Sequence, residues 1–184
     1  MKASHFFNLG KNCGKRMCLP REEKRMESRV KQAVDTFESG FNCCQSVFAT
    51  YADLFGMDRE TALRMSCSMG GGVGRMREIC GTVSAMALLA GFECGNTDPE
   101  NEDAKTYNYE KVRSLADAFK EKQGTIICRE LLGIQEREES AAPSERTEQY
   151  YATRPCSKMV ACAAQLIEEM LLPELFSGEM GNPR

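Results

Sequence analysis

The sequence has no tryptophan, a single histidine, His5, and six prolines among its 184 residues. It also lacks an excess of basic residues, because its formal net charge is −3, whereas nucleic-acid-binding domains normally carry surplus positive charge. Its longest apolar stretch, residues 83–92, is about half as long as the roughly 20 residues of a membrane-spanning helix. We therefore expect no nucleic-acid partner and no membrane span.

Short cysteine motifs are missing too, although the chain has ten cysteines. No C-x-x-C occurs, which argues against thioredoxin-like sites and zinc ribbons. No C-x-x-C-H occurs, which excludes covalent attachment of a c-type haem. With one histidine in the chain, sulfur is the only abundant soft ligand, and a site built from cysteines must be assembled by the fold.

The N-terminal residues, MKASHFFNLGKNCGKRMC, contain no apolar run of the length that a secretory signal needs. We therefore expect a cytoplasmic protein. Cytoplasmic thiols stay reduced unless they take part in chemistry, so the many cysteines indicate redox or metal chemistry.

Hydrophobic residues recur at helical spacing along most of the chain, and no useful period-two alternation of a strand is present. The fold predicted is all-α, a single-domain bundle of six or seven helices. The segment over residues 80–92 is apolar nearly all round, which predicts a buried central helix. The other predicted helices, bounded by capping residues, prolines and glycines, are 20–39, 42–56, 58–69, 104–123, 125–133 and 155–173.

The domain boundaries follow from the same patterns. Residues 1–19 are predicted to be a flexible extension, residues 20–173 the helical four-cysteine domain, and residues 174–184 a frayed tail. Residues 135–149 are polar and are predicted to form a solvated loop.

Four cysteines stand at or near the start of a predicted helix. Cys43 follows the capping residue Asn42, Cys80 opens the buried helix, Cys128 comes three residues after Thr125, and Cys156 follows Pro155. A helix N-terminus carries partial positive charge and unpaired N–H donors, which stabilise a thiolate. We therefore select Cys43, Cys80, Cys128 and Cys156 as candidate redox thiols, or as ligands if a metal is bound.

The other cysteines and the glycines have weaker signals. Cys67 and Cys162 fall inside predicted helices and are expected to pack in the core, while Cys13, Cys18 and Cys44 receive no role. The GGGVGR segment matches neither nucleotide-binding glycine motif. It predicts either a tight turn that needs positive φ or a loop whose backbone amides contact the sulfurs, with candidate residues Gly70, Gly71, Gly72, Gly74 and, after Cys80, Gly81.

Four segments resemble the bacterial and archaeal redox-active proteins named for their C_GCAxxG_C_C cysteine pattern. These segments are SGFNCCQSVF around Cys43, GGGVGRMREICGTVSA around Cys80, GTIICRELLG around Cys128 and RPCSKMVACAAQLIEE around Cys156. The resemblance spans residues 27–172. It places the family's four characteristic cysteines on the same four that helix position selects.

The resemblance implies an all-α domain, similar to part of split-Soret cytochrome c, with a four-cysteine centre able to hold a [2Fe-2S] cluster. The family's central motif, C-G-A-x-x-G, reads CGTVSA here, so that Thr82 and Ala85 depart from it. An added hydroxyl and an added methyl group favour a shifted reduction potential or an altered fit to a partner.

Three functions are compatible with the four cysteines. In the first, the cysteines bind an iron–sulfur cluster in an electron-transfer or redox-sensing protein. In the second, they are the reactive thiols of a thiol–disulfide exchange protein. In the third, they bind zinc or simply pack in the core of a non-redox helical binding module. The first two readings describe an electron carrier or an oxidoreductase and require a redox partner protein, which the sequence does not identify. The ample apolar helix surface favours a homodimer.

Overall fold

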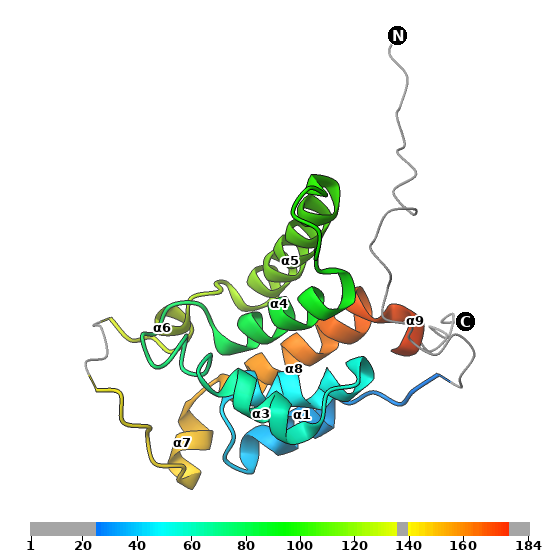
Figure 1. Cartoon of the computed structure of the whole chain (residues 1–184). Coiled ribbons are helices and arrows are strands. Elements are labelled where there is room, and N and C mark those ends of the chain that lie inside the picture. The colour runs from blue at the N-terminus through cyan, green and yellow to red at the C-terminus, as the bar shows by residue number, and fades with distance from the viewer. Residues whose placement is uncertain (1–24, 136–139, 177–184) are drawn as a thin grey trace, which may run out of the picture.

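The chain folds into packed helices in a computed structural model that describes residues 25–135 and 140–176 (Figure 1). Nine α-helices lie in these ranges, six of them with seven or more residues, and no strand does. This confirms the prediction of an all-α single body. The elements are α1 (Val30–Glu38), α2 (Cys43–Tyr51), the 3-10 helix η1 (Ala52–Phe55), α3 (Arg59–Cys67), α4 (Gly81–Cys94), α5 (Glu102–Gln123), α6 (Cys128–Leu131), α7 (Glu148–Thr153), α8 (Cys156–Leu166), the π-helix η2 (Ile167–Leu171) and α9 (Pro173–Phe176).

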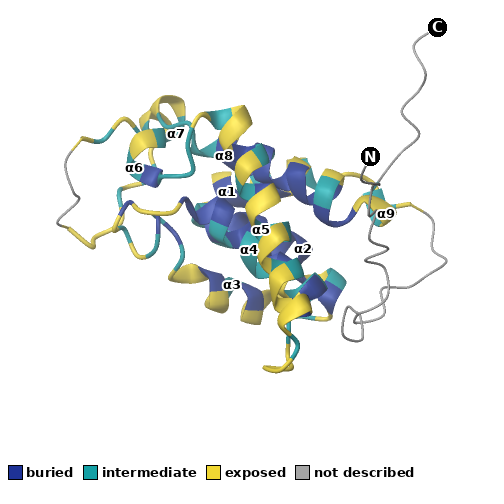
Figure 2. Ribbon diagram, turned by 90° about the horizontal axis from the view of Figure 1, so that it is seen from above, coloured by how far each residue is buried: buried dark blue, intermediate teal, exposed yellow. Residues whose placement is uncertain are grey.

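The core lies where α2, α4 and α8 meet, and Figure 2 shows the buried residues concentrated there. α4 contributes Ala85, Met86 and Leu89, which are almost fully buried, in agreement with the prediction of a buried helix over residues 80–92. The sequence did not reveal that α2 is equally central, with seven of its nine residues buried. Two helices therefore share the centre of the body.

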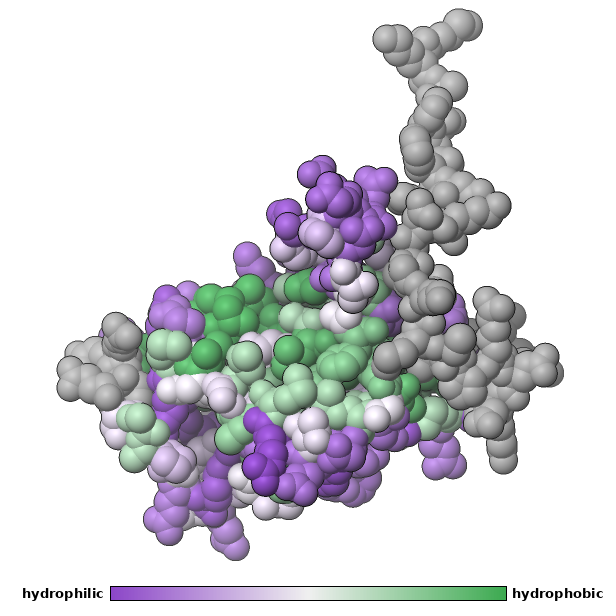
Figure 3. All heavy atoms as spheres, viewed as in Figure 1, coloured by the Kyte–Doolittle hydropathy of each residue, from purple (hydrophilic) through white to green (hydrophobic). Residues whose placement is uncertain are grey.

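The outer helices are arranged around this core. α1 packs against α8, α3 packs against α2, and α5 packs against α4. The N-terminal part of α5 extends away from the other helices, while α6 and α7 lie at one end of the body and α9 at the other (Figure 1). On the face shown in Figure 3, hydrophobic residues gather over α4, between the polar surfaces of α5 and α3.

Several helix boundaries differ from the prediction. α1 begins at Val30, not after Pro20, because residues 25–29 are not helical: the N–H of Met26 donates to the carbonyl of Leu175 and the N–H of Arg29 donates to Glu168. α6 begins at Cys128 itself, since the Thr125 hydroxyl accepts from Ile127 ahead of the helix. α7 was not predicted: it begins within the last residues of the segment predicted to be a loop, 135–149, and continues beyond it, and its N-cap Thr147 accepts from the Tyr150 N–H.

The predicted terminal segments fall partly outside the structure. Residues 1–19 lie outside the described residues, as do residues 177–184. Residues 174–176, predicted to be part of a frayed tail, complete α9 instead, where the Phe176 ring packs edge-on against Tyr51 at 5.9 Å. In the parts of the chain that the structure describes, no helix combines the length and the apolar character needed to cross a membrane.

A buried polar cluster joins α2 to η2 and to the segment before α1. The Glu168 carboxylate, 8% exposed, accepts from the Tyr51 hydroxyl at 2.7 Å and from the Arg29 backbone N–H at 2.7 Å. The Arg29 side chain bonds in turn to Asp53 at 2.6 Å. Burying a carboxylate is costly unless it is hydrogen-bonded, so each of these donors contributes to stability.

Replacing Tyr51 by Phe should lower the free energy of unfolding by about 1–3 kcal/mol, because the buried Glu168 carboxylate loses a donor. Tyr109→Phe is the matched control, since Tyr109 is 58% exposed and its change should stay within about 0.5 kcal/mol. Urea denaturation followed by circular dichroism measures both. Equal stability of the two variants would contradict the role given to the Tyr51 hydroxyl.

Candidate functional site

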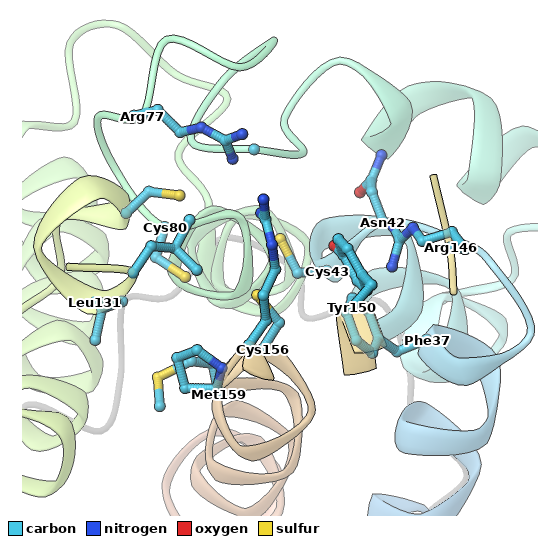
Figure 4. Close-up of a pocket in the computed structure, with 15 residues that line it drawn as sticks. Phe37, Asn42, Cys43, Arg77, Cys80, Leu131, Arg146, Tyr150, Cys156 and Met159 are labelled. Atoms are coloured by element: carbon cyan, nitrogen blue, oxygen red, sulfur yellow. The ribbon is translucent and has the colours of Figure 1, made fainter. Parts of the chain in front are cut away.

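One cavity of about 60 Å³ is lined by all four selected cysteines (Figure 4). Cys43 is the first residue of α2, Cys80 is the N-cap of α4, Cys128 is the first residue of α6, and Cys156 is the first residue of α8. The structure therefore brings together cysteines that are up to 113 positions apart in the chain. Residues of the glycine-rich loop and of the segment around α7 close the remaining sides.

The position of Cys43 is set by the cap of α2. The Asn42 side-chain oxygen accepts from the Cys44 and Gln45 N–H groups, both at 3.0 Å, and the Gln45 side chain accepts from the Asn42 N–H at 3.1 Å. This reciprocal pattern is a capping box. The Asn42 amide also donates to the Cys67 carbonyl at 2.9 Å, which ties the start of α2 to the end of α3.

The Cys43 sulfur is a hydrogen-bond acceptor from several directions. The Cys80 thiol donates to it, as do the backbone N–H groups of Gly71, Cys44 and Gly81. The Cys80 donor has the largest effect, and together these donors lower the pKa of Cys43 to about 6 although burial opposes ionisation. Cys43 is therefore a thiolate at neutral pH.

The same hydrogen bond keeps Cys80 protonated. Because the Cys80 thiol donates to Cys43, and because Cys80 is buried beside that negative charge, the pKa of Cys80 lies well above its ordinary value. The Thr82 hydroxyl is in hydrogen-bond contact with the Cys80 sulfur at 3.2 Å. Thr82, one of the two departures from the family's central motif, thus contacts one of the selected sulfurs directly.

The remaining two selected cysteines are neutral thiols. Burial is the main cause of a raised pKa at Cys128 and at Cys156, where it reaches about 12, and the negative charge of Cys43 adds to the effect at both. The Arg77 side chain donates a hydrogen bond to Cys128, which partly offsets the rise in its pKa. The site therefore holds one thiolate and three thiols.

Three arginines line the cavity, and no Asp or Glu within residues 25–135 and 140–176 does. Arg77 is 3% exposed. The Arg146 guanidinium carbon lies 4.6 Å from the Tyr150 ring centre and 4.9 Å from that of Phe37, and the Arg154 carbon lies 4.7 Å from the Tyr150 centre. Tyr150 therefore contacts two guanidinium groups, an arrangement that stabilises both cations.

The sequence analysis missed Arg146 and Tyr150 because both stand in or next to the polar stretch read as a solvated loop. Their interleaving of basic and aromatic residues, ERTEQYYATR, was the available signal. Only the fold shows that this stretch lines the cavity beside the start of α2, where Arg146 donates to the Phe41 carbonyl.

The candidate glycines differ in how close a side chain at each position would come to the neighbouring atoms. A Cβ at Gly81 would lie 2.7 Å from the Cys43 sulfur, and one at Gly72 would lie 2.8 Å from the Cys128 Cβ. A Cβ at Gly70 would collide with the Asn42 side chain, and Gly71, which has φ of +63°, donates its N–H to Cys43. Gly74 does not approach the sulfurs, because the nearest neighbour of its Cβ would be the Ser68 carbonyl at 3.8 Å.

The thiol groups of the other described cysteines do not line the cavity. Cys162 is buried, as predicted, but Cys67 is exposed, because α3 turns Ala62 and Ser66 inward and Cys67 outward. Cys44 is buried, and burial raises its pKa. Cys13 and Cys18 lie outside the described residues.

The four cysteines are not arranged as the ligands of a metal ion would be. Within residues 25–135 and 140–176, no group of three or more Cys, His, Asp or Glu side chains is placed so that it can hold a metal ion. The donor set has the right chemistry for iron or zinc, but in this conformation it does not fit a four-coordinate centre.

A family model described as "Putative redox-active protein (C_GCAxxG_C_C)" matches residues 41–170 of the chain. The match covers 130 of the 184 residues and includes Cys43, Cys80, Cys128 and Cys156. No curated protein and no solved structure matches the chain significantly.

Replacing Gly81 by Ala should displace the Cys43 sulfur from its backbone donors and raise the pKa of Cys43 from about 6 toward the ordinary value of about 8.5. The measurement is the pH dependence of iodoacetamide labelling at Cys43, resolved by peptide mass spectrometry.

Gly91→Ala, in the same helix, is the control, because nothing lies within 4 Å of a Cβ at that position. It should leave the pKa of Cys43 unchanged and stabilise the protein by about 0.5–1 kcal/mol, since alanine is the better helix residue. An unchanged labelling profile in Gly81→Ala would show that the close approach of α4 to Cys43 is not needed.

Proposed function

Because the chain belongs to the C_GCAxxG_C_C family of redox-active proteins, we propose that Cys43 and Cys80 form a dithiol–disulfide redox centre. The observation that carries the proposal is the close approach of the two cysteines: both line one cavity, a Cβ at Gly81, next to Cys80, would lie 2.7 Å from the Cys43 sulfur, and the Cys80 thiol donates to the Cys43 thiolate. Two sulfurs in such contact need only small side-chain movements to reach the S–S bond length of about 2.0 Å.

The two cysteines have different roles in this centre. Cys43 is the nucleophile, because it is ionised at neutral pH and thiolates are the reactive form of cysteine. Cys80 is the resolving thiol, since it stays protonated until Cys43 loses its negative charge. Oxidation joins the sulfurs, releases the proton of Cys80 and transfers two electrons to an acceptor, and reduction reverses each change.

An iron–sulfur centre is the second candidate, since all four cysteines line one cavity beside three arginines. Four thiolates are the usual ligands of a [2Fe-2S] cluster, and the arginines would offset its negative charge. This candidate requires the cysteines to move, because within the described residues no three of them are placed to hold a metal. The dithiol centre involves only Cys43 and Cys80, which already share a hydrogen bond, and we therefore place it first.

The deciding measurement is made on protein purified without oxygen. After mild oxidation we expect a loss of two hydrogen atoms in mass and a Cys43–Cys80 disulfide in non-reducing peptide maps. Cys80→Ser should abolish this disulfide, whereas Cys67→Ser, at an exposed thiol, should leave it intact. Stoichiometric iron and acid-labile sulfide, with a visible spectrum lost in each of the four single Cys→Ser variants, would instead establish the cluster. Zinc alone would favour a structural site.

The acidity of Cys43 should depend on the donor at position 80. In the wild type the labelling rate at Cys43 should be half-maximal near pH 6, falling below this pH as the thiolate is protonated and levelling off above it. Cys80→Ser retains a hydroxyl donor and should keep the pKa of Cys43 low, whereas Cys80→Ala removes the donor and should raise it. Iodoacetamide labelling from pH 4 to 10 separates the variants, and identical profiles for Ser and Ala would contradict the role of the sulfur–sulfur hydrogen bond.

A further inference from the structure

We propose that the cavity beside Cys43 is a binding site for a small anion, so that the compound with which Cys43 reacts is itself negatively charged. This inference rests on the proposed function, because it names the class of compound that meets the nucleophile. Three observations carry it: the charge of the cavity wall, the state of the Arg146 side chain, and the size of the cavity.

The wall of the cavity is positively charged in an otherwise acidic protein. Arg77, Arg146 and Arg154 line it with no Asp or Glu from the described part of the chain, while the whole chain has a formal net charge of −3. The Cys43 thiolate offsets one of these three charges and the other cysteines in the wall are neutral, so the described lining residues are positively charged in sum. A pocket lined by one sign of charge concentrates ligands of the opposite sign.

Arg146 has hydrogen-bonding capacity beyond its protein contacts. Its guanidinium lies over the Phe37 and Tyr150 rings, and its Nη2 donates to the Phe41 carbonyl at 3.2 Å. Its Nη1 is buried and has no hydrogen-bond partner among the described residues. A buried, unsatisfied N–H of a cation is costly, and an oxyanion would accept from it. Stacking leaves the N–H groups in the guanidinium plane able to meet such an anion.

The size of the cavity limits the ligand. A volume of about 60 Å³ accommodates roughly four to six water-sized groups at about 10–15 Å³ each. A compound of about five heavy atoms, such as a tetrahedral oxyanion, fits this space. Figure 4 shows Cys43, Cys80 and Cys156 facing this space, with Arg77 on the loop opposite.

The test compares two alkylating reagents of equal size, anionic iodoacetate and neutral iodoacetamide, on the reduced full-length protein. The ratio of their rates is measured at Cys43 and at the exposed Cys67 by peptide mass spectrometry. Because each cysteine is compared with itself, differences in ionisation cancel. We expect the iodoacetate-to-iodoacetamide ratio at Cys43 to exceed that at Cys67 by about tenfold. Inorganic phosphate should slow both reactions at Cys43 more than sodium chloride of equal ionic strength does.

Variants connect the preference to the arginines. Arg146→Gln should lower the ratio at Cys43 several-fold. Arg154→Gln, a second variant at a side chain that within the described residues bonds to the Ser144 hydroxyl and not to a backbone carbonyl, should do the same. Arg64→Gln is the matched control, because Arg64 is exposed and pairs with Glu60 on α3, and it should leave the ratio unchanged.

The outcomes separate this inference from the proposed function. A Cys43 that reacts readily but with the same ratio as Cys67 would overturn the anion site and leave the redox pair standing. A Cys43 that reacts with neither reagent would overturn the nucleophile, and the anion proposal with it.

Discussion

The Cys43 sulfur, held as an anion at the start of a buried helix, is the feature on which the rest of the site depends. Its charge is stabilised by three backbone N–H groups and one thiol, contributed by α2, by the first turn of α4 and by the glycine-rich loop. Backbone donors can reach a sulfur only where no side chain intervenes, which explains a glycine at position 81. α2 packs against α4 at the centre of the hydrophobic core. The close approach of these two helices therefore both builds the core and brings the donors of α4 to the Cys43 sulfur.

The charge at Cys43 also contributes to the state of its neighbours. Burial is the main reason why Cys128 and Cys156 keep their protons, and the hydrogen bond to Cys43 is the main reason at Cys80, but the negative charge of Cys43 raises the pKa of all three. The site is thus chemically asymmetric although it is built from four identical residue types. Such asymmetry suits a reaction in which one thiol attacks and another resolves.

Much of this was predictable from local patterns. The apolar run over residues 80–92, the Asn42 cap and the placement of four cysteines at helix starts are properties of neighbouring residues, and the structure has the corresponding helices. The start of α1 was not predictable, because the backbone N–H groups of the residues before it donate to Glu168 and Leu175, more than 130 positions away. α7 was missed because it is short and polar, and no periodic apolar face marks it.

The sequence by itself determined the helical class, the core helix α4 and the helix starts at which the cysteines stand, since helix formation and capping depend on residues a few positions apart. Only the tertiary structure decided which cysteine is ionised, which thiol donates to it, and that Arg146 and Tyr150 close the same cavity. These properties depend on distances between elements remote in the chain and on the exclusion of water between them, and neither is encoded in any local pattern of residues.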